Sequence, residues 1–294
     1  MITAELVKQL REMTGAGMMD CKKALTETDG DLDKAVTFLR EKGIASAAKK
    51  SSRVAAEGSV GTYVSPDGNT AVIVEVNCET DFVGKNENFV AFVKQTARDI
   101  AEGVSEEALA EKAKEVIANI GENIVIRRSE KYVLDGDGMF GEYIHMGGKI
   151  GVLLQAKCDA ALVGSAKMQE YLKDVAMQIA AANPTYLDQT QVPQEVIDKE
   201  KDILIHQAEN EGKSKEIAEK MVAGRIQKMF KEVCLVDQPF VKDDKISIAQ
   251  FTKNTAKELG GNIELVRFTR YQMGEGLEKR SENFAEEIAK QING

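Results

Sequence analysis

GTYVSPDGNTAVIVEVNC at residues 61–78 and GEYIHMGGKIGVLLQAKC at residues 141–158 repeat one pattern at a constant offset of 141 − 61 = 80 residues. Each stretch predicts a strand, a glycine-containing turn and a second strand, and an amphipathic helical pattern follows each of them. The chain is therefore expected to have an α+β fold with a duplicated core and antiparallel sheets. The matching positions include Gly61 and Gly141, Tyr63 and Tyr143, Gly68 and Gly148, Val72 and Val152, and Cys78 and Cys158.

A third strand is predicted to complete each copy, because GENIVIRRSEKY at residues 121–132 resembles GGNIELVRFTRY at residues 260–271. These stretches lie 260 − 121 = 139 residues apart, so the second copy holds about 139 − 80 = 59 additional residues, within 184–245. Two long helical patterns, 196–211 and 215–233, occupy this insertion. We expect a helical hairpin, or coiled-coil arm. Such a hairpin is marginally stable alone and needs a partner surface or a second copy of itself.

The first 43 residues predict three short helices, the third ending at Gly43, with apolar side chains at helical spacing. The small, polar and basic stretch ASAAKKSSRVAAEG at residues 45–58 is typical of a linker. The expected domains are 1–54 for the helices and linker, 55–140 for the core N-subdomain, 141–183 and 246–273 for the core C-subdomain, and 184–245 for the arm.

The composition limits the classes of function. The 294 residues include 48 acidic and 39 basic side chains, and this net charge of −9 argues against a nucleic-acid-binding protein. No apolar run reaches the ~18 residues of a membrane span, and the N-terminal stretch lacks a secretion signal, so we expect a cytoplasmic protein. The four widely spaced cysteines predict reduced thiols, and with only two histidines we expect no bound metal.

Two residues are candidates for catalysis. His145 lies just before the turn of the second hairpin, with no matching serine or cysteine motif. A contact with a partner is therefore favoured over a role as a general base. Cys78 has a counterpart in Cys158, and this favours a packing role in both strands over a nucleophile in one.

Four residues that follow the second strand of the first copy, Thr80, Asp81, Phe82 and Val83, allow two interpretations. In one, Asp81 caps a turn and Phe82 folds back onto the core. In the other, the carboxylate and the ring form a tip that is presented to a partner. The corresponding residues of the second copy, AALV at 160–163, have neither group, which favours a function specific to the first copy.

Six short stretches carry a resemblance to a known family: TGAGMMDCKKAL at 14–25, VNCETDFVGKNENF at 76–89, KIGVL at 149–153, EIAEKMVAGR at 216–225, QPFV at 238–241 and GEGLEK at 274–279. In this order they resemble the bacterial elongation factor Ts family, the nucleotide exchange factors for elongation factor Tu. The resemblance extends over essentially the whole chain. It implies that the N-terminal helices are a ubiquitin-associated-like domain, and it adds a C-terminal helical module at 274–294.

The resemblance also implies a mechanism without covalent chemistry and without a cofactor. In this family the loop that corresponds to Thr80, Asp81, Phe82 and Val83 enters the GTPase domain of elongation factor Tu near its magnesium ion. No contact with nucleic acid or a membrane is implied. The other implied partner-binding residues are Met18, Met19 and Lys22 for the same domain, Ile120 and Gly121 for a further contact, and His145 for another domain of the partner.

Three hypotheses follow for the function. The first is a nucleotide exchange factor that releases GDP through Asp81 and Phe82. The second is a non-exchanging scaffold or holdase-like interaction protein, which predicts that these two residues are dispensable. The third is a thiol-dependent enzyme acting through Cys78, which is disfavoured because no base or oxyanion motif accompanies the thiol. The stoichiometry of the complex and the role of the arm stay open.

Overall fold

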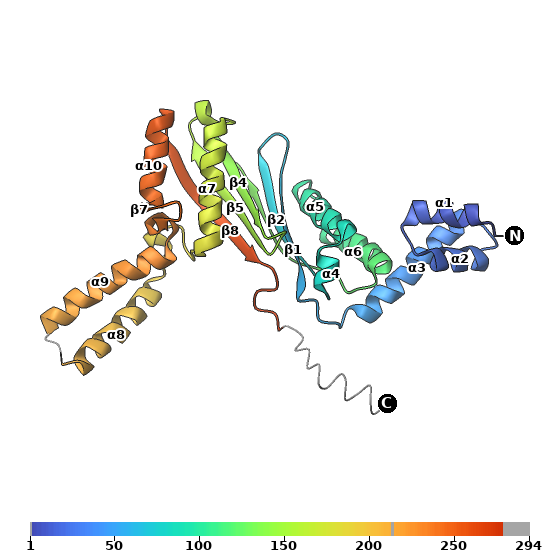
Figure 1. Cartoon of the computed structure of the whole chain (residues 1–294), viewed down its shortest axis with the longest axis horizontal. Coiled ribbons are helices and arrows are strands. Elements are labelled where there is room, and N and C mark those ends of the chain that lie inside the picture. Colours follow the sequence, from blue (N-terminus) through green and yellow to red (C-terminus); the bar gives the residue numbers. More distant parts are fainter. Residues whose placement is uncertain (1, 213–214, 279–294) are drawn as a thin grey trace.

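The computed structural model describes residues 2–212 and 215–278 and shows an elongated molecule (Figure 1). A bundle of N-terminal helices lies at one end, a pair of long helices lies at the other, and two β-sheets with their own helices lie between them. Within the described residues, none of the helices is long and apolar enough to cross a membrane. The predicted C-terminal helical module at 274–294 lies outside the described residues from residue 279 on, and its described residues, 274–278, contain no helix.

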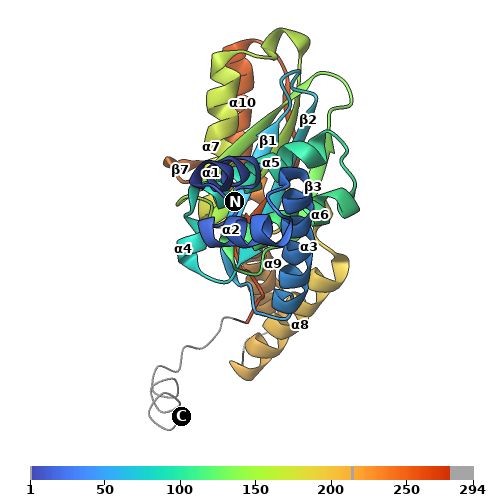
Figure 2. The same ribbon diagram turned by 90° about the vertical axis from the view of Figure 1, so that its right-hand side faces the viewer.

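The N-terminal module consists of three helices, as predicted: α1 (Ala4–Thr14), α2 (Met18–Glu27) and α3 (Leu32–Lys50). Thr3 caps α1 by accepting a hydrogen bond from the N–H of Leu6, and Asp31 caps α3 in the same way. Leu10, Cys21 and Leu25 are fully buried between the helices. Figure 2 shows this module from its own end of the molecule.

The predicted end of the third helix at Gly43 is wrong, because α3 continues to Lys50. A glycine inside a helix costs about 1 kcal/mol relative to alanine, so Gly43 suggested a helix end. In the structure Gly43 lies against α6 (Glu106–Ile120), where a Cβ would be only 2.9 Å from the Cβ of Ala118. Ala47 is buried against the core that α6 covers. Packing on α6 therefore keeps the predicted linker helical as far as residue 50.

The core contains two antiparallel three-stranded sheets, which confirms the predicted duplication. Their strand orders are β1-β2-β3 and β4-β5-β8. Each central strand has an irregularity at the same place in the repeat, between Glu75 and Val76 in β2 and between Gln155 and Ala156 in β5. The strands are β1 (Glu57–Val64), β2 (Thr70–Cys78), β3 (Val125–Val133), β4 (Gly138–His145), β5 (Ile150–Cys158) and β8 (Ile263–Gln272).

Two helices accompany each sheet, whereas the sequence indicated one. They are α5 (Glu87–Ala101) and α6 with the first sheet, and α7 (Ala166–Ala182) and α10 (Ile248–Leu259) with the second. Figure 1 shows the resulting layers, in which the two sheets lie between the two pairs of helices. The inner faces of the sheets meet through a shared apolar cluster that contains Ile73, Leu153 and Tyr271.

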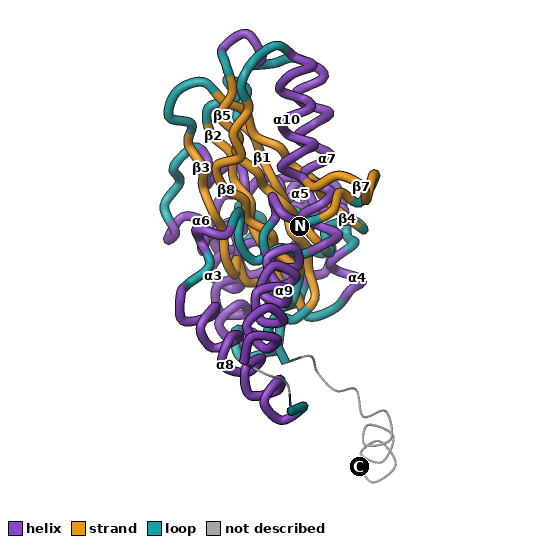
Figure 3. Tube along the Cα trace, turned by 90° about the vertical axis from the view of Figure 1, so that its left-hand side faces the viewer, coloured by secondary structure: helices purple, strands orange, loops and turns teal. Residues whose placement is uncertain are grey.

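The insertion of the second copy contains two helices, α8 (Gln194–Asn210) and α9 (Lys215–Val233). Figure 3 shows them extending away from the strands. Their contact is apolar and includes Val222, Ile226 and Phe230. Buried Gln178 of α7 holds the base of this arm, since it donates to Gln238 at 3.0 Å and accepts from the N–H of Val241 at 2.8 Å. The short elements at the base are η2 (Gln189–Gln191), η3 (Leu235–Asp237), β6 (Pro239–Phe240) and β7 (Asp243–Ser247).

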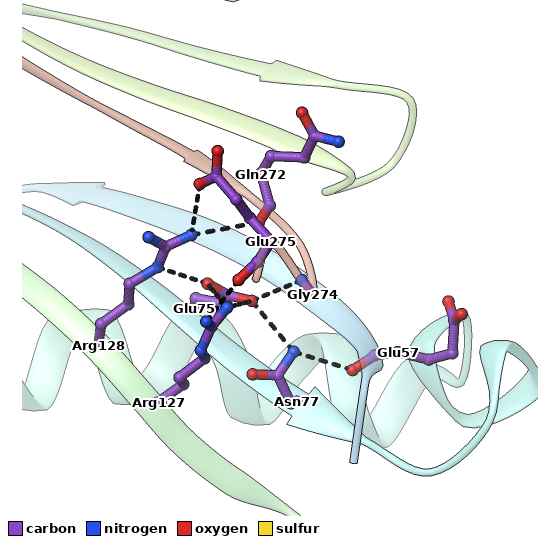
Figure 4. Close-up of polar contacts among 8 residues, drawn as sticks. All are labelled: Glu57, Glu75, Asn77, Arg127, Arg128, Gln272, Gly274 and Glu275. Atoms are coloured by element: carbon purple, nitrogen blue, oxygen red, sulfur yellow. Dashed lines mark hydrogen bonds and ion pairs between the residues drawn. The ribbon is translucent and has the colours of Figure 1, made fainter. Parts of the chain in front are cut away.

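A buried carboxylate joins the two halves of the core (Figure 4). The Glu75 side chain on β2 is fully buried and accepts hydrogen bonds from Arg128 at 2.6 Å and from the N–H of Gly274 at 2.7 Å. Arg127 and Asn77 also donate to it, each at 3.1 Å. Because Gly274 follows β8, this network attaches the end of the second half to the first sheet. Gln155 stands at the corresponding position of the second copy, where its amide oxygen accepts from Arg267 at 2.7 Å.

Replacing Glu75 with alanine should destabilise the fold by about 3 kcal/mol, because two arginines and a backbone N–H lose a buried charged acceptor. Urea unfolding monitored by circular dichroism measures the change. Gln155→Ala is the matched control and should cost less, about 1.5 kcal/mol, because it removes a single hydrogen bond from the Arg267 guanidinium. Equal losses in the two variants would contradict a special role for the carboxylate.

The stabilisation from Glu75 should also depend on pH. Burial disfavours its charged form, but hydrogen bonds from Gly274, Arg128 and Asn77 outweigh this effect and hold the pKa of Glu75 below its usual value of 4.5. A lowered folded-state pKa gives stability that is present above the unfolded-state pKa and lost as the pH falls through the folded-state value. The difference in unfolding free energy between wild type and Glu75→Ala should therefore be constant near neutral pH and shrink below about pH 4.5. A constant difference in acid would contradict this.

Candidate partner-binding site

Phe82 is the most exposed large apolar side chain of the described residues, with 82% of its surface accessible. It lies in α4 (Asp81–Gly84), a single helical turn directly after β2. The Thr80 hydroxyl oxygen caps this turn by accepting from the N–H of Val83, and Asp81 pairs with Lys85 at 2.7 Å. The turn therefore has local support while its aromatic ring points into solvent.

The second copy shows that the fold does not require this exposure. Its equivalent segment is a short 3-10 turn, η1 (Ala160–Leu162), and Leu162 occupies the position of Phe82 at the offset of 80 residues. Leu162 is only 6% exposed and belongs to the apolar core of its half. The interpretation in which Phe82 folds back onto the core is wrong. An exposed ring at a position that is buried in the sister copy indicates an interaction surface.

The α4 turn is attached closely to the first sheet. Val83 is half-buried against the apolar cluster of that sheet. Gly84 is buried against β1, where a Cβ would lie 3.1 Å from the carbonyl oxygen of Gly58. The backbone that carries Phe82 is therefore packed tightly against the first sheet.

The structure places the predicted contact segment at Ile120 and Gly121 beside this turn. Ile120 ends α6 and is half-buried, and Gly121 follows with a φ of 90°. The next residue, Glu122, accepts hydrogen bonds from the N–H groups of Glu79 and Thr80, both at 3.0 Å. Sequence reasoning missed Glu122, although comparing the copies could have found it, because the equivalent position is Gly261.

The hairpin that carries His145 also lies close to the α4 turn. The exposed tip turns through Met146 and Gly147, with φ values of 48° and 65°, and the carbonyl of Gly148 accepts from the N–H of Val60 on β1 at 2.8 Å. His145 is exposed, and its Nδ1 lies 3.1 Å from the Tyr143 hydroxyl. The hairpin and the α4 turn thus both adjoin the beginning of β1, so residues predicted from separate motifs share one region of the core.

The charges near the turn favour an ionised Asp81. The pKa of this carboxyl lies below its usual range, mainly because Lys85 hydrogen-bonds to it, with a smaller contribution from the positive charge of Lys149 on the His145 hairpin. The carboxylate and the ring of Phe82 are neighbours on the same exposed turn. Together they present a negative charge and a large apolar surface to solvent.

Met18, Met19 and Lys22 lie on α2 of the N-terminal module, separate from the α4 turn. All three are exposed, and the two methionines show 61% and 73% of their surface. The module is attached to α6, since the Asn119 side chain donates to the carbonyl of Thr14 at 3.3 Å. Met18 and Met19 therefore expose a second apolar surface, with the charged Lys22 on the same helix.

Cys78 does not suit a nucleophile. It is fully buried, and burial raises the pKa of its thiol to about 12. Its counterpart Cys158 is also buried with a raised pKa, so the predicted packing role of both thiols is confirmed. Among residues 2–212 and 215–278, no three His, Cys, Asp or Glu side chains are grouped to hold a metal ion.

Large apolar side chains exposed on well-packed elements are typical of the class of proteins that act through contacts with another protein. The comparisons identify the family. The family model described as "Elongation factor TS" matches residues 79–275. Elongation factor Ts of Clostridium novyi (strain NT) is 52% identical over 100% of this chain and 99% of its own length. The corresponding factors of Clostridium perfringens (strain 13) and a Nitratiruptor species are 54% and 50% identical, each over 99% of both chains. The chain belongs to the elongation factor Ts family.

Phe82→Ala should leave the stability of the isolated protein within about 0.5 kcal/mol of wild type, because the ring contributes little to the core. Leu162→Ala, the matched change in the second copy, should cost about 2–5 kcal/mol as a buried leucine. Urea unfolding of both variants measures the contrast. A loss of similar size in Phe82→Ala would show that the ring packs inside in solution.

Proposed function

We propose that this chain is the guanine nucleotide exchange factor for elongation factor Tu in translation elongation, acting in the cytoplasm. In this proposal the Asp81–Phe82 turn enters the GTPase domain near its magnesium site, GDP leaves, and GTP binding then releases the factor. No covalent bond is made or broken. The exposed Phe82 ring on its supported turn is the observation that carries the proposal, together with the family relationship.

The available energy is of the required size. Burying a phenylalanine ring removes about 150–250 Å² from water, which corresponds to about 4–6 kcal/mol before the costs of ordering. A thousandfold loss of nucleotide affinity requires about 4 kcal/mol. Because Phe82 is 82% exposed in the free protein, most of this area is still available for burial against a partner.

The charge of Asp81 suits a site beside a bound metal ion. Mg²⁺ requires near-ideal octahedral coordination at about 2.0–2.1 Å, so a small displacement of its ligands releases it. Without the metal, the phosphate charge of GDP is poorly neutralised and the nucleotide dissociates. Linkage makes the effect reciprocal: if the factor weakens nucleotide binding, nucleotide weakens binding of the factor by the same ratio.

The remaining surfaces supply affinity in this proposal. Met18, Met19 and Lys22 of α2 bind the GTPase domain, and the α6 end at Ile120 and Gly121 extends that contact beside the α4 turn. The hairpin with His145 reaches a further domain of the partner. The arm of α8 and α9 is a candidate surface for self-association, because exposed Val196, Ile203 and Ile217 remain on it.

Release of a fluorescent GDP from elongation factor Tu tests the proposal. The wild-type chain should accelerate release steeply, and Phe82→Ala should lose at least about tenfold, equivalent to about 1.4 kcal/mol. Val163→Ala is the matched control, because Val163 is an exposed apolar residue just after the equivalent turn of the second copy. It should behave as wild type.

Each other outcome has a definite meaning. If wild type does not accelerate release, the exchange function is wrong and the scaffold hypothesis replaces it. If wild type accelerates release and Phe82→Ala equals it, exchange stands but insertion of the ring does not cause it.

A further inference from the structure

We propose that Glu122 is a positioning residue for exchange: its carboxylate holds the Thr80 end of the α4 turn and so fixes the direction in which Phe82 is presented. This inference rests on the proposed exchange function. It deepens that function by assigning a role to a residue that does not belong to the turn.

Both oxygens of the Glu122 carboxylate accept hydrogen bonds from residues 79–80, just before and at the start of the α4 turn. Oε2 accepts from the N–H groups of Glu79 and Thr80 at 3.0 Å, and Oε1 accepts from the Thr80 hydroxyl at 2.6 Å. The same hydroxyl oxygen accepts from the N–H of Val83 and thereby caps α4. One side chain on the segment after α6 therefore orients the residue that begins the Phe82 turn.

A second contact runs in the opposite direction between the same two segments. The Glu79 carboxylate accepts from the N–H of Asn123 at 2.6 Å, and the Asn123 side chain donates to the carbonyl of Arg53 at 2.8 Å. Residues 79–80 and 122–123 are thus joined by reciprocal hydrogen bonds to carboxylates. Hydrogen bonds to a charged acceptor are roughly twice as strong as neutral ones.

Comparison with the second half of the core shows which of these two contacts belongs to the shared fold and which occurs in the first half alone. Asp159 and Asn262 stand at the positions of Glu79 and Asn123, and the Asp159 carboxylate accepts from the N–H of Asn262 at 2.9 Å. This contact therefore belongs to the shared fold. Glu122 and Thr80, in contrast, are replaced by Gly261 and Ala160. The copy without the Glu122–Thr80 pair is the copy in which the side chain at the Phe82 position turns into the core.

This difference indicates what the Glu122 carboxylate is for. The strand-to-helix connection forms in the second half without it, so folding of the connection does not depend on it. The additional three hydrogen bonds occur where an aromatic side chain must stay exposed, against the tendency of an apolar ring to bury itself. Holding Thr80 from outside the turn keeps Phe82 ready to insert and reduces the ordering cost of binding.

Glu122→Ala should reduce the acceleration of GDP release from elongation factor Tu about tenfold, the ratio expected for a lost charge-assisted contact. Glu122→Gln should lose clearly less than Glu122→Ala, because its oxygen can still accept from both N–H groups and its amide can donate to the Thr80 hydroxyl, although the charge is gone. Glu111→Ala is the matched control, since it removes a carboxylate of α6 that pairs with Lys114 at 2.6 Å and has no hydrogen bond to the α4 turn among those of the described residues. It should show wild-type release.

A double-mutant cycle with Phe82→Ala tests whether Glu122 acts through the ring. If it does, Glu122→Ala causes no further loss once Phe82 is alanine. An undiminished tenfold loss in that background would overturn the inference, as would a wild-type rate for Glu122→Ala or equal defects in Glu122→Ala and Glu122→Gln.

Measuring amide hydrogen exchange on the free chain tests the role of Glu122 independently of the proposed nucleotide exchange function. Glu122→Ala should speed exchange at the N–H groups of Glu79 and Thr80, while Glu111→Ala leaves them unchanged. If the wild-type chain fails to release GDP but these amides respond, the proposed function is wrong and the structural part of the inference stands. If the amides do not respond, the inference is wrong whatever the release assay shows.

Discussion

The buried Glu75 carboxylate lies where the two halves of the core meet, and the relative position of the proposed binding surfaces depends on that contact. A buried charge is tolerated only when it is paired and hydrogen-bonded, and here two arginines, an asparagine and the N–H of Gly274 satisfy it. Glu75 is also on β2, the strand that leads into the α4 turn. Around it, the inner faces of the sheets exchange cation–π contacts: Arg128 lies 4.2 Å from the ring centre of Tyr271, and Arg267 lies 3.9 Å from that of Tyr132.

These two cation–π contacts show how far the duplication is retained. Arg128 and Arg267, like Tyr132 and Tyr271, are 139 residues apart, so each half contributes the arginine that stacks on the tyrosine of the other. The copies diverge where function is proposed. Phe82 is exposed while Leu162 is buried, and Glu122 binds the turn while Gly261 cannot. The two copies of one scaffold thus differ: the first carries the exposed α4 turn, and the second carries the His145 hairpin and the arm.

Much of the architecture could be predicted from local patterns. The repeat predicted both sheets, and the arithmetic of the two offsets predicted the insertion that contains α8 and α9. The predicted end of the third helix was wrong. Glycine disfavours a helix when considered alone, but here the absence of a Cβ at Gly43 allows α3 to pack closely against Ala118. The other residues of the candidate site were named from the sequence through the family resemblance, but Glu122 was not. The arrangement of the site could not be predicted, since the hydrogen bonds between residues 79–80 and 122–123 join segments that are far apart along the chain.

The sequence by itself determined the duplication, the insertion and the N-terminal helices, because periodicity, capping and turn chemistry act over a few residues. The candidate binding residues came instead from the family resemblance. The tertiary structure decided whether Phe82 is buried or exposed. That choice depends on what fills the space beneath the turn and on which distant groups hold it, and neither is written in the local pattern. The same physical reason applies to Glu75 and Gln155, which stand at equivalent positions of the two copies. The sequence shows that one is a carboxylate and the other an amide, but only the tertiary structure shows the groups that hydrogen-bond to each of them. Glu75 accepts from the N–H of Gly274 after β8, whereas Gln155 accepts from Arg267.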